Sequence, residues 1–347
     1  MIPALVPVRD VHRIDPAVLQ RWMEKHVEGF SGAITAHQFQ GGQSNPTYHL
    51  AADGREYVLR RKPPGKLLPS AHAVDREYRV ITALQETGVP VPRTYVYCDD
   101  VAIVGTPFYV MSYVRGRLFR DPHLAGATPA ERTAIYDSMN QIEARLHTLD
   151  PEKLGLGDFG RPGNYYARQI HRWSQQYKIS ETEKIEAMER LMEWLPANIP
   201  PGDETTLVHG DYRAGNMLMH ETEPRVIAVL DWELSTLGHP LADLAYNCMP
   251  WRLSNEWEGL AGRDLPALGI PTEEAYVVDY CRRTGRPGIP DWDWYIAFAM
   301  FRLAAIAQGI MGRVRDGTAN DPEAAERGRR ARPLAESGWA MIERRAR

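Results

Sequence analysis

LVHGDYRAGNMLM, residues 207 to 219, places a histidine, an aspartate and an asparagine between two apolar runs. His209, Asp211 and Asn216 are the first, third and eighth residues of an octet within it. Polar side chains in an apolar frame are costly to bury unless partners or a ligand satisfy them. The stretch is therefore open to three interpretations: a metal site, a hydrogen-bonded structural turn, or a catalytic loop.

A second apolar run, residues 225 to 230, follows closely and ends in Asp231. Two short strands on either side of residues 221 to 224 would pair as a hairpin. Such a hairpin brings Asn216, at one end of the first strand, near Asp231, at the far end of the second. We therefore expect Asp211, Asn216 and Asp231 to converge on one small volume.

The side chains of these three residues offer carboxylate and amide oxygens, which suit Mg²⁺. His209 and Asp211 could instead be two ligands of a zinc-like site, but no second His or Cys lies at zinc-like spacing nearby. We interpret His209 as a packed, hydrogen-bonded residue that shapes the loop.

The run from His209 to Asn216, followed by Asp231, resembles the catalytic and metal-binding segments of the aminoglycoside phosphotransferase family, which has the protein-kinase-like fold. The pattern H-G-D-x-x-x-x-N with a later D at a strand end is far more specific than a lone glycine motif. The resemblance covers about residues 30 to 310. It implies that Asp211 is the catalytic base, that Asn216 and Asp231 hold Mg²⁺, and that ATP is the donor. It also implies that Asp243 is structural and hydrogen-bonds the loop.

The N-terminal part contains candidates for the nucleotide site that this resemblance implies. A small-residue turn between two expected strands would let backbone N–H groups approach phosphate, although an ordinary Gly-Gly hairpin turn is at least as common. Its members are Gly41, Gly42, Gln43, Ser44 and Asn45. Further on, a β-rich run resembles the hinge between lobes, where backbone groups would meet adenine. The hinge candidates are Ser112, Tyr113 and Val114.

Arg60 stands at the strand position where the family usually has lysine. Its bidentate guanidinium also suits phosphate. Glu77 lies on the apolar side of a helix expected over residues 71 to 86, where a carboxylate needs a buried partner. We expect an Arg60–Glu77 ion pair; the alternative for Glu77 is a rim residue that reaches solvent.

The chain as a whole is predicted to be α+β, a two-lobed protein-kinase-like fold. Residues 1–113 are expected to form a small antiparallel sheet with one helix, the nucleotide-binding lobe, and residues 114–347 a mainly helical catalytic and substrate-binding lobe. Capping-box sequences predict helices that begin after Thr128 and after Ser180. The apolar run 291–314 predicts a buried helix.

Composition narrows the class of protein. The chain has 347 residues, 44% of them hydrophobic and 25% charged, which is typical of a folded globular protein. A formal net charge of -4 creates no field for polyanions, so we expect no nucleic-acid or membrane partner. The three widely spaced cysteines suit no disulfide framework, and we find no secretory leader and no run of about 18 apolar residues. We expect a cytoplasmic protein.

Within the family, the run from Tyr57 to Tyr78 is most similar to the phosphotransferase-like domains fused to acyl-CoA dehydrogenases. The resemblance implies an ATP-dependent kinase that phosphorylates a hydroxyl group of a small molecule, with a hydroxyacyl compound as a candidate acceptor. An aminoglycoside kinase, the first alternative, would need many carboxylates to meet a polycation. A nucleotide-binding pseudokinase or scaffold is favoured by Arg60 alone. A metal-dependent hydrolase would use the same oxygens without ATP.

Overall fold

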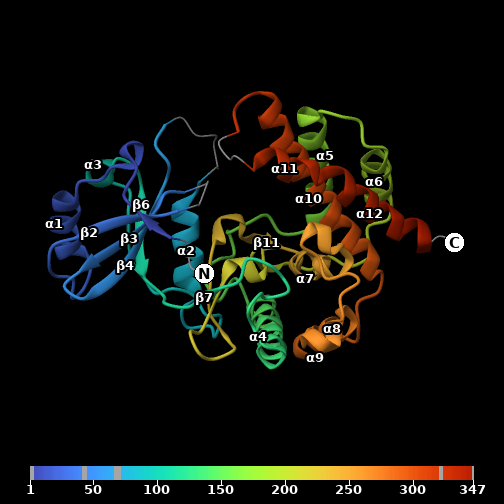
Figure 1. Cartoon of the computed structure of the whole chain (residues 1–347), viewed down its shortest axis with the longest axis horizontal. Helices are drawn as coiled ribbons and strands as arrows, with labels where there is room; N and C mark the ends of the chain where they lie inside the picture. The colour runs from blue at the N-terminus through green and yellow to red at the C-terminus, as the bar shows by residue number, and fades with distance from the viewer. Residues whose placement is uncertain (1–3, 41–44, 66–71, 320–322, 346–347) are drawn as a thin grey trace. The chain divides into compact units, whose positions relative to one another are not determined.

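The computed structural model describes residues 4–40, 45–65, 72–319 and 323–345 (Figure 1). The chain forms two compact units. Unit 1 comprises Met1–Arg120, Glu152–Phe159 and Ala214–Ser235. Unit 2 comprises Asp121–Pro151, Gly160–Arg213 and Thr236–Arg347. The sequence predicted a single division after residue 113, whereas two later segments are grouped with the N-terminal part.

Unit 1 is built on an antiparallel sheet, which in the described residues has six strands in the order β1-β2-β3-β4-β6-β5. The tight turn between β3 and β4 uses Asp53 and Gly54, both with positive φ, as a two-residue hairpin turn requires. Strands β3 and β4 therefore pair as an antiparallel hairpin around this turn. The strands are β1 (Leu5–Val6), β2 (Thr35–Phe39), β3 (Thr47–Ala52), β4 (Arg55–Arg61), β5 (Thr94–Cys98) and β6 (Phe108–Ser112).

The helices of unit 1 pack against this sheet. Helix α1 (Pro16–His26) begins at Asp15, whose carboxylate accepts from the amide of Ala17 at 2.9 Å, and it buries Leu19 and Met23 in the core beside β3. Helix α2 (Val74–Leu84) contacts β5 and β6 (Figure 1) and is the helix expected from the stripe at residues 71 to 86. A short α3 (Val101–Val104) precedes β6.

A second, smaller sheet of unit 1 joins β7 (Arg117–Leu118), β9 (Met217–Met219) and β10 (Val226–Val229) in the order β10-β9-β7. Strands β9 and β10 are antiparallel, with Met217 opposite Val229. The short 3₁₀ helices η2 (Ala214–Asn216) and η3 (Trp232–Leu234) lie just before and just after this hairpin. The predicted hairpin is confirmed.

Unit 2 is mainly helical, and its longest described helix is the apolar α10 (Trp292–Arg315). By length and composition α10 could cross a membrane, but 78% of its most apolar window is buried, as in the core helix of a folded domain. It contacts α5, α7, α11 and α12 (Figure 1), which confirms the predicted buried helix. The other elements are α4 (Pro129–His147), α5 (Tyr165–Ser180), α6 (Glu186–Ala197), α7 (Pro240–Cys248), α8 (Leu265–Leu268), α9 (Glu273–Thr284), α11 (Ala324–Arg329), α12 (Ala331–Arg345), η4 (Met249–Arg252), η5 (Asn255–Trp257) and the strand pair β8 (Thr206–Val208) and β11 (Thr236–Gly238).

Of the two predicted capping boxes, one is present. Thr128 and Glu131 cap α4 reciprocally, as expected. The predicted start after Ser180 is wrong, because Ser180 is the last residue of α5 and its hydroxyl donates to the carbonyl of Gln176 at 2.7 Å. Helix α6 begins after Ile185 instead. A serine hydroxyl that bonds back along its own helix cannot cap the next one.

Candidate active site

The predicted site residues fall in both units. Arg60, Glu77, Asn216 and Asp231 belong to unit 1, and Asp211 belongs to unit 2. Four members of the predicted phosphate turn lie outside the described residues: Gly41, Gly42, Gln43 and Ser44.

Arg60 connects three carboxylates in unit 1. Its Nε lies 2.9 Å from Glu77 Oε2, and its Nη2 lies 2.8 Å from Asp231 Oδ1 and 3.5 Å from Glu233 Oε2. The Arg60–Glu77 ion pair expected from the sequence is therefore present. A lysine ammonium is a compact point charge, whereas the planar fork of arginine can meet carboxylates in several directions at once.

Burial and the neighbouring charges shift the pKa values of Glu77 and Arg60 in opposite directions. Burial raises the pKa of Glu77 to about 7, against the attraction of Arg60. Burial alone would lower the pKa of Arg60, but Glu77 and Asp231 outweigh it and hold that pKa above its usual value. Arg60 is therefore charged at all working pH values.

Asp231 follows β10 in the left-handed backbone region, with φ of 65°. The amide of the preceding Leu230 donates to the carbonyl of Asn216 at 2.8 Å, so the hairpin brings the two predicted metal ligands together at its ends. The described residues contain no group of three His, Cys, Asp or Glu side chains arranged to hold a metal. One carboxylate and one amide fit Mg²⁺, which usually completes its shell with phosphate and water.

Glu233 was missed by the sequence analysis. Its Oε2 lies near Arg60 and also accepts from Asn45 Nδ2 at 3.4 Å, which ties the end of the predicted phosphate turn to the same network. Asn45 Oδ1 in turn lies 3.2 Å from His72 Nδ1. The position of Glu233, two residues after Asp231, was the available signal, because a carboxylate so close to a predicted metal ligand shares its surroundings.

The predicted hinge lies at the end of β6. Ser112 exchanges hydrogen bonds with Arg93: its amide donates to the Arg93 carbonyl at 2.7 Å, and its hydroxyl accepts from the Arg93 amide at 3.0 Å. Tyr113 packs edge-on against His49, with ring centroids 4.9 Å apart. Since the Ser112 amide already has a partner, the backbone groups left to contact adenine would be the Ser112 carbonyl and those of Tyr113 and Val114.

In unit 2, Asp243 holds the loop that carries Asp211. The Asp243 carboxylate accepts from the amides of His209 at 2.5 Å and Gly210 at 2.8 Å, and His147 Nε2 lies 3.5 Å away. Burial would raise the pKa of Asp243, but the hydrogen bond and charge of His147 outweigh it and lower that pKa. The expected bond from Asp243 to the loop is confirmed.

His209 is fully buried, and its Nδ1 accepts from the amide of Asp211 at 3.2 Å. This is the packed, loop-shaping role inferred from the sequence rather than that of a metal ligand. It fixes the backbone from which the Asp211 side chain projects.

The Asp211 carboxylate is 21% exposed and has two neighbours that the sequence analysis did not identify. Arg213 Nε lies 3.2 Å and 3.3 Å from its two oxygens. The Tyr246 hydroxyl forms a hydrogen bond with it. Beneath the loop, Arg302 Nη2 donates to the Gly210 carbonyl at 2.6 Å. The charge of Arg302 within an apolar helix was the signal available in the sequence.

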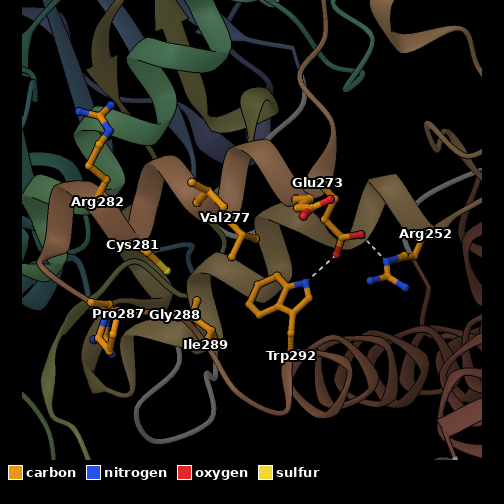
Figure 2. Close-up of a pocket in the computed structure, with 12 residues that line it drawn as sticks. Arg252, Glu273, Val277, Cys281, Arg282, Pro287, Gly288, Ile289 and Trp292 are labelled. Atoms are coloured by element: carbon orange, nitrogen blue, oxygen red, sulfur yellow. Dashed lines mark hydrogen bonds and ion pairs between the residues drawn. The ribbon is translucent and has the colours of Figure 1, made fainter.

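A cavity of about 490 Å³ lies elsewhere in unit 2, between α9 and the start of α10. Figure 2 shows Val277, Cys281 and Trp292 along it and the Arg252–Glu273 ion pair at one end. Trp292 Nε1 donates to Glu273 Oε1 at 2.7 Å. The predicted site residues are not among those that line this cavity.

The segment from residue 238 to residue 313 is rich in aromatic side chains, and most of them are buried in the core. Trp294 and Phe298 stack with ring centroids 5.9 Å apart, and both are buried. Trp292 alone of the tryptophans lines the cavity shown in Figure 2. The richness in aromatic side chains therefore reflects packing more than a pocket.

Comparison with known proteins places these features in a family. Residues 35–296 match the model described as the phosphotransferase enzyme family. The chain is 44% identical over 346 residues to acyl-CoA dehydrogenase family member 10 of Mus musculus, which covers 97% of this chain. It spans only 32% of the length of that mouse protein.

Comparison with solved structures supports the same family. A structure from Ralstonia eutropha, named as a candidate aminoglycoside phosphotransferase, is 53% identical, with a TM-score of 0.89 over 96% of this chain and 99% of that one. A thermostable mutant of aminoglycoside phosphotransferase APH(4)-Ia, in complex with ADP and hygromycin B, is 17% identical, with a TM-score of 0.60 over 93% and 99% of the two chains, which shows a shared fold. The chain therefore belongs to the phosphotransferase enzyme family, with the protein-kinase-like fold of the aminoglycoside phosphotransferases, and this membership supports a kinase-like phosphotransfer activity.

Proposed function

We propose that the protein transfers the γ-phosphoryl group of ATP, with Mg²⁺, to a hydroxyl group of a small molecule. The observation that carries the proposal is the partly exposed carboxylate of Asp211 on a loop that the buried Asp243 holds by two backbone amides. A purely structural turn has no need of an exposed carboxylate on so firmly held a backbone.

In the reaction, the acceptor oxygen bonds to the γ-phosphorus while the bond from that phosphorus to the bridging oxygen of ADP breaks. Asp211 either accepts the hydroxyl proton or orients the hydroxyl group until that proton leaves. Asn216 and Asp231 would hold Mg²⁺, which neutralises charge on the phosphates when bound. Arg60 keeps its Nε on Glu77. Its Nη2, which here lies against Asp231 and Glu233, would exchange those carboxylates for phosphate oxygens.

The acceptor that these residues favour is not a polycation. Arg213 lies against Asp211, and Arg302 lies under the preceding residue, so positive charge surrounds the base. An amine-rich antibiotic would meet like charge there, which costs affinity. The mouse relative is named for acyl-CoA dehydrogenases, and this supports a hydroxyacyl compound as the acceptor.

A nucleotide-binding module without turnover is the second candidate, and Arg60 at the lysine position is the observation that favours it. The Arg60–Glu77 pair is nevertheless intact at 2.9 Å, so the substitution preserves the ion pair that a kinase-like fold requires.

A Mg-ATP turnover screen against pooled hydroxylated metabolites, including hydroxyacyl-CoAs and aminoglycosides, tests the proposal. We expect one acceptor class to be phosphorylated, with ADP formed in equal amount. Nucleotide binding without ADP formation in any pool would establish the non-catalytic module, and phosphorylation of aminoglycosides alone would overturn the acceptor assignment. Cleavage of a metabolite by water, with no ATP consumed, would point to a hydrolase.

A further inference from the structure

We infer that Tyr246 and Arg302 are positioning residues of the phosphotransfer reaction, a role that rests on the proposed function. Together they hold the Gly210–Asp211 dipeptide from two different helices. Arg302, on α10, donates to the carbonyl of Gly210, and its guanidinium carbon lies 5.5 Å from the ring centre of Tyr246, on α7. The Tyr246 hydroxyl is hydrogen-bonded to the Asp211 carboxylate.

Tyr246 is suited to donate to Asp211. Burial raises the pKa of its hydroxyl, and the negative charge of Asp211 raises it further. The phenol therefore keeps its proton at neutral pH and can serve as a fixed donor to a carboxylate. A hydrogen bond to a charged acceptor is stronger than a neutral one and is more directional than a solvent contact.

Arg302 is 8% exposed within an apolar helix, a costly place for a cation unless its surroundings satisfy it. The guanidinium carbon lies 5.5 Å from the ring centre of Tyr246 and 5.9 Å from that of Trp173. From this position, Nη2 donates to the Gly210 carbonyl at 2.6 Å. Cation–π contacts and one short bond thus hold the charge in a fixed place.

Arg302 and Tyr246 act on two neighbouring residues, Gly210 and Asp211. Gly210 has φ of 86°, a conformation that glycine adopts readily, so its flanking peptide planes depend on bonds to keep their orientation. Arg302 fixes the carbonyl of the peptide that leads into Asp211, and Tyr246 fixes the carboxylate that follows. Because the Tyr246 ring also packs on Arg302, loss of either side chain loosens both contacts. A misplacement of about 1 Å at a reacting group can cost on the order of 100-fold in rate.

The experiment compares Tyr246→Phe, Arg302→Met and Arg302→Lys with the wild type in the full chain. Tyr246→Phe removes the hydroxyl but keeps the ring that packs on Arg302. We expect kcat to fall roughly 10-fold for Tyr246→Phe and more for Arg302→Met, with KM for ATP within about twofold. Arg302→Lys should recover part of the loss, because lysine can still donate to the carbonyl.

Matched controls lie in the same unit. Tyr136 is a buried tyrosine on α4 whose hydroxyl donates to the carbonyl of Pro122, and Arg283 on α9 donates to Asn140 Oδ1 at 2.5 Å. Tyr136→Phe and Arg283→Met remove the same chemical groups away from Asp211, and we expect both to leave kcat unchanged.

Amide hydrogen exchange of residues 209–213 supplies a readout that needs no turnover. We expect faster exchange there in Tyr246→Phe and Arg302→Met than in the two controls. Unchanged exchange in both variants would overturn the inference, whatever the activity. If the wild type turns over and kcat is unaltered in both variants, the inference is overturned but the proposed function stands. If the wild type phosphorylates no acceptor, the proposed function is overturned together with the reaction role of these residues.

Discussion

Arg60 in unit 1, which is partly buried, and Arg302 in unit 2, which is buried, both lie near an aspartate, but different partners satisfy them. Arg60 meets the carboxylates of Glu77, Asp231 and Glu233. Arg302 meets a carbonyl and two aromatic faces. Carboxylates around an arginine can be exchanged for phosphate oxygens, whereas a backbone carbonyl and aromatic faces hold the arginine in one place. The first arrangement suits a site that takes up a charged ligand, and the second suits a loop that must not move.

We expect the largest effect from a change at Asp211, the residue whose loop Arg302 supports. If Asp211 is the base, Asp211→Ala should lower turnover by roughly 10²–10⁴-fold while the fold and nucleotide affinity persist. Steady-state kinetics with the identified acceptor measure this. Arg213→Ala is the companion variant, since it removes the neighbour of Asp211 but keeps the carboxylate. ADP formation at the wild-type rate in Asp211→Ala with a genuine acceptor would remove this role.

The first arrangement is tested by Arg60→Met. This change leaves Glu77 buried without its cation, and breaking a buried pair on one side typically costs about 3–5 kcal/mol of stability. Urea unfolding measures the loss. The double variant Arg60→Met with Glu77→Gln should recover part of it, because no buried charge then remains. Equal stability of the single variant and the wild type would show that the pair is not a structural element.

These contrasts also show where the sequence was informative. The H-G-D loop, the hairpin that leads to Asp231 and the Glu77 stripe depend on spacing within a few residues, and all three were predicted. The Arg60–Glu77 pair was predictable as well, because a carboxylate on an apolar face demands a cation.

What the sequence did not reveal depends on distant segments. Tyr246 and Arg302 reach the Asp211 loop from helices α7 and α10, and no local pattern specifies which buried polar side chain meets which loop. The false capping box at Ser180 has a local cause instead, since the residue continues α5 and its hydroxyl bonds back to Gln176. Helix α1 and strand β5 also went unpredicted, although Asp15 followed by Pro16 was a usable start signal.

Asp231→Asn tests the carboxylates around Arg60 further. The change removes one carboxylate from Arg60 and removes the charge of the proposed Mg²⁺ ligand. We expect Mg-nucleotide affinity to fall by about 1.5–3 kcal/mol, the usual value of a bond to a charged group. Calorimetric titration with and without Mg²⁺ measures it, and Glu233→Gln, which keeps Asp231, is the matched variant. The metal assignment fails if the wild type binds nucleotide equally well with and without Mg²⁺.

The smallest effect concerns His239, the residue that caps α7, the helix that carries both Asp243 and Tyr246. Its Nδ1 accepts from the amide of Leu241 at 3.3 Å, and burial lowers its pKa to about 4. The unfolded chain, with a histidine pKa near 6.5, binds this proton more readily than the folded one, so stability should fall as pH drops from about 6.5 to 4. In His239→Asn, a good cap that does not titrate, that fall should be smaller by about 1–2 kcal/mol. Urea unfolding at pH 7 and pH 4.5 measures the difference, and identical pH dependence in both proteins would show that His239 is not the group that titrates.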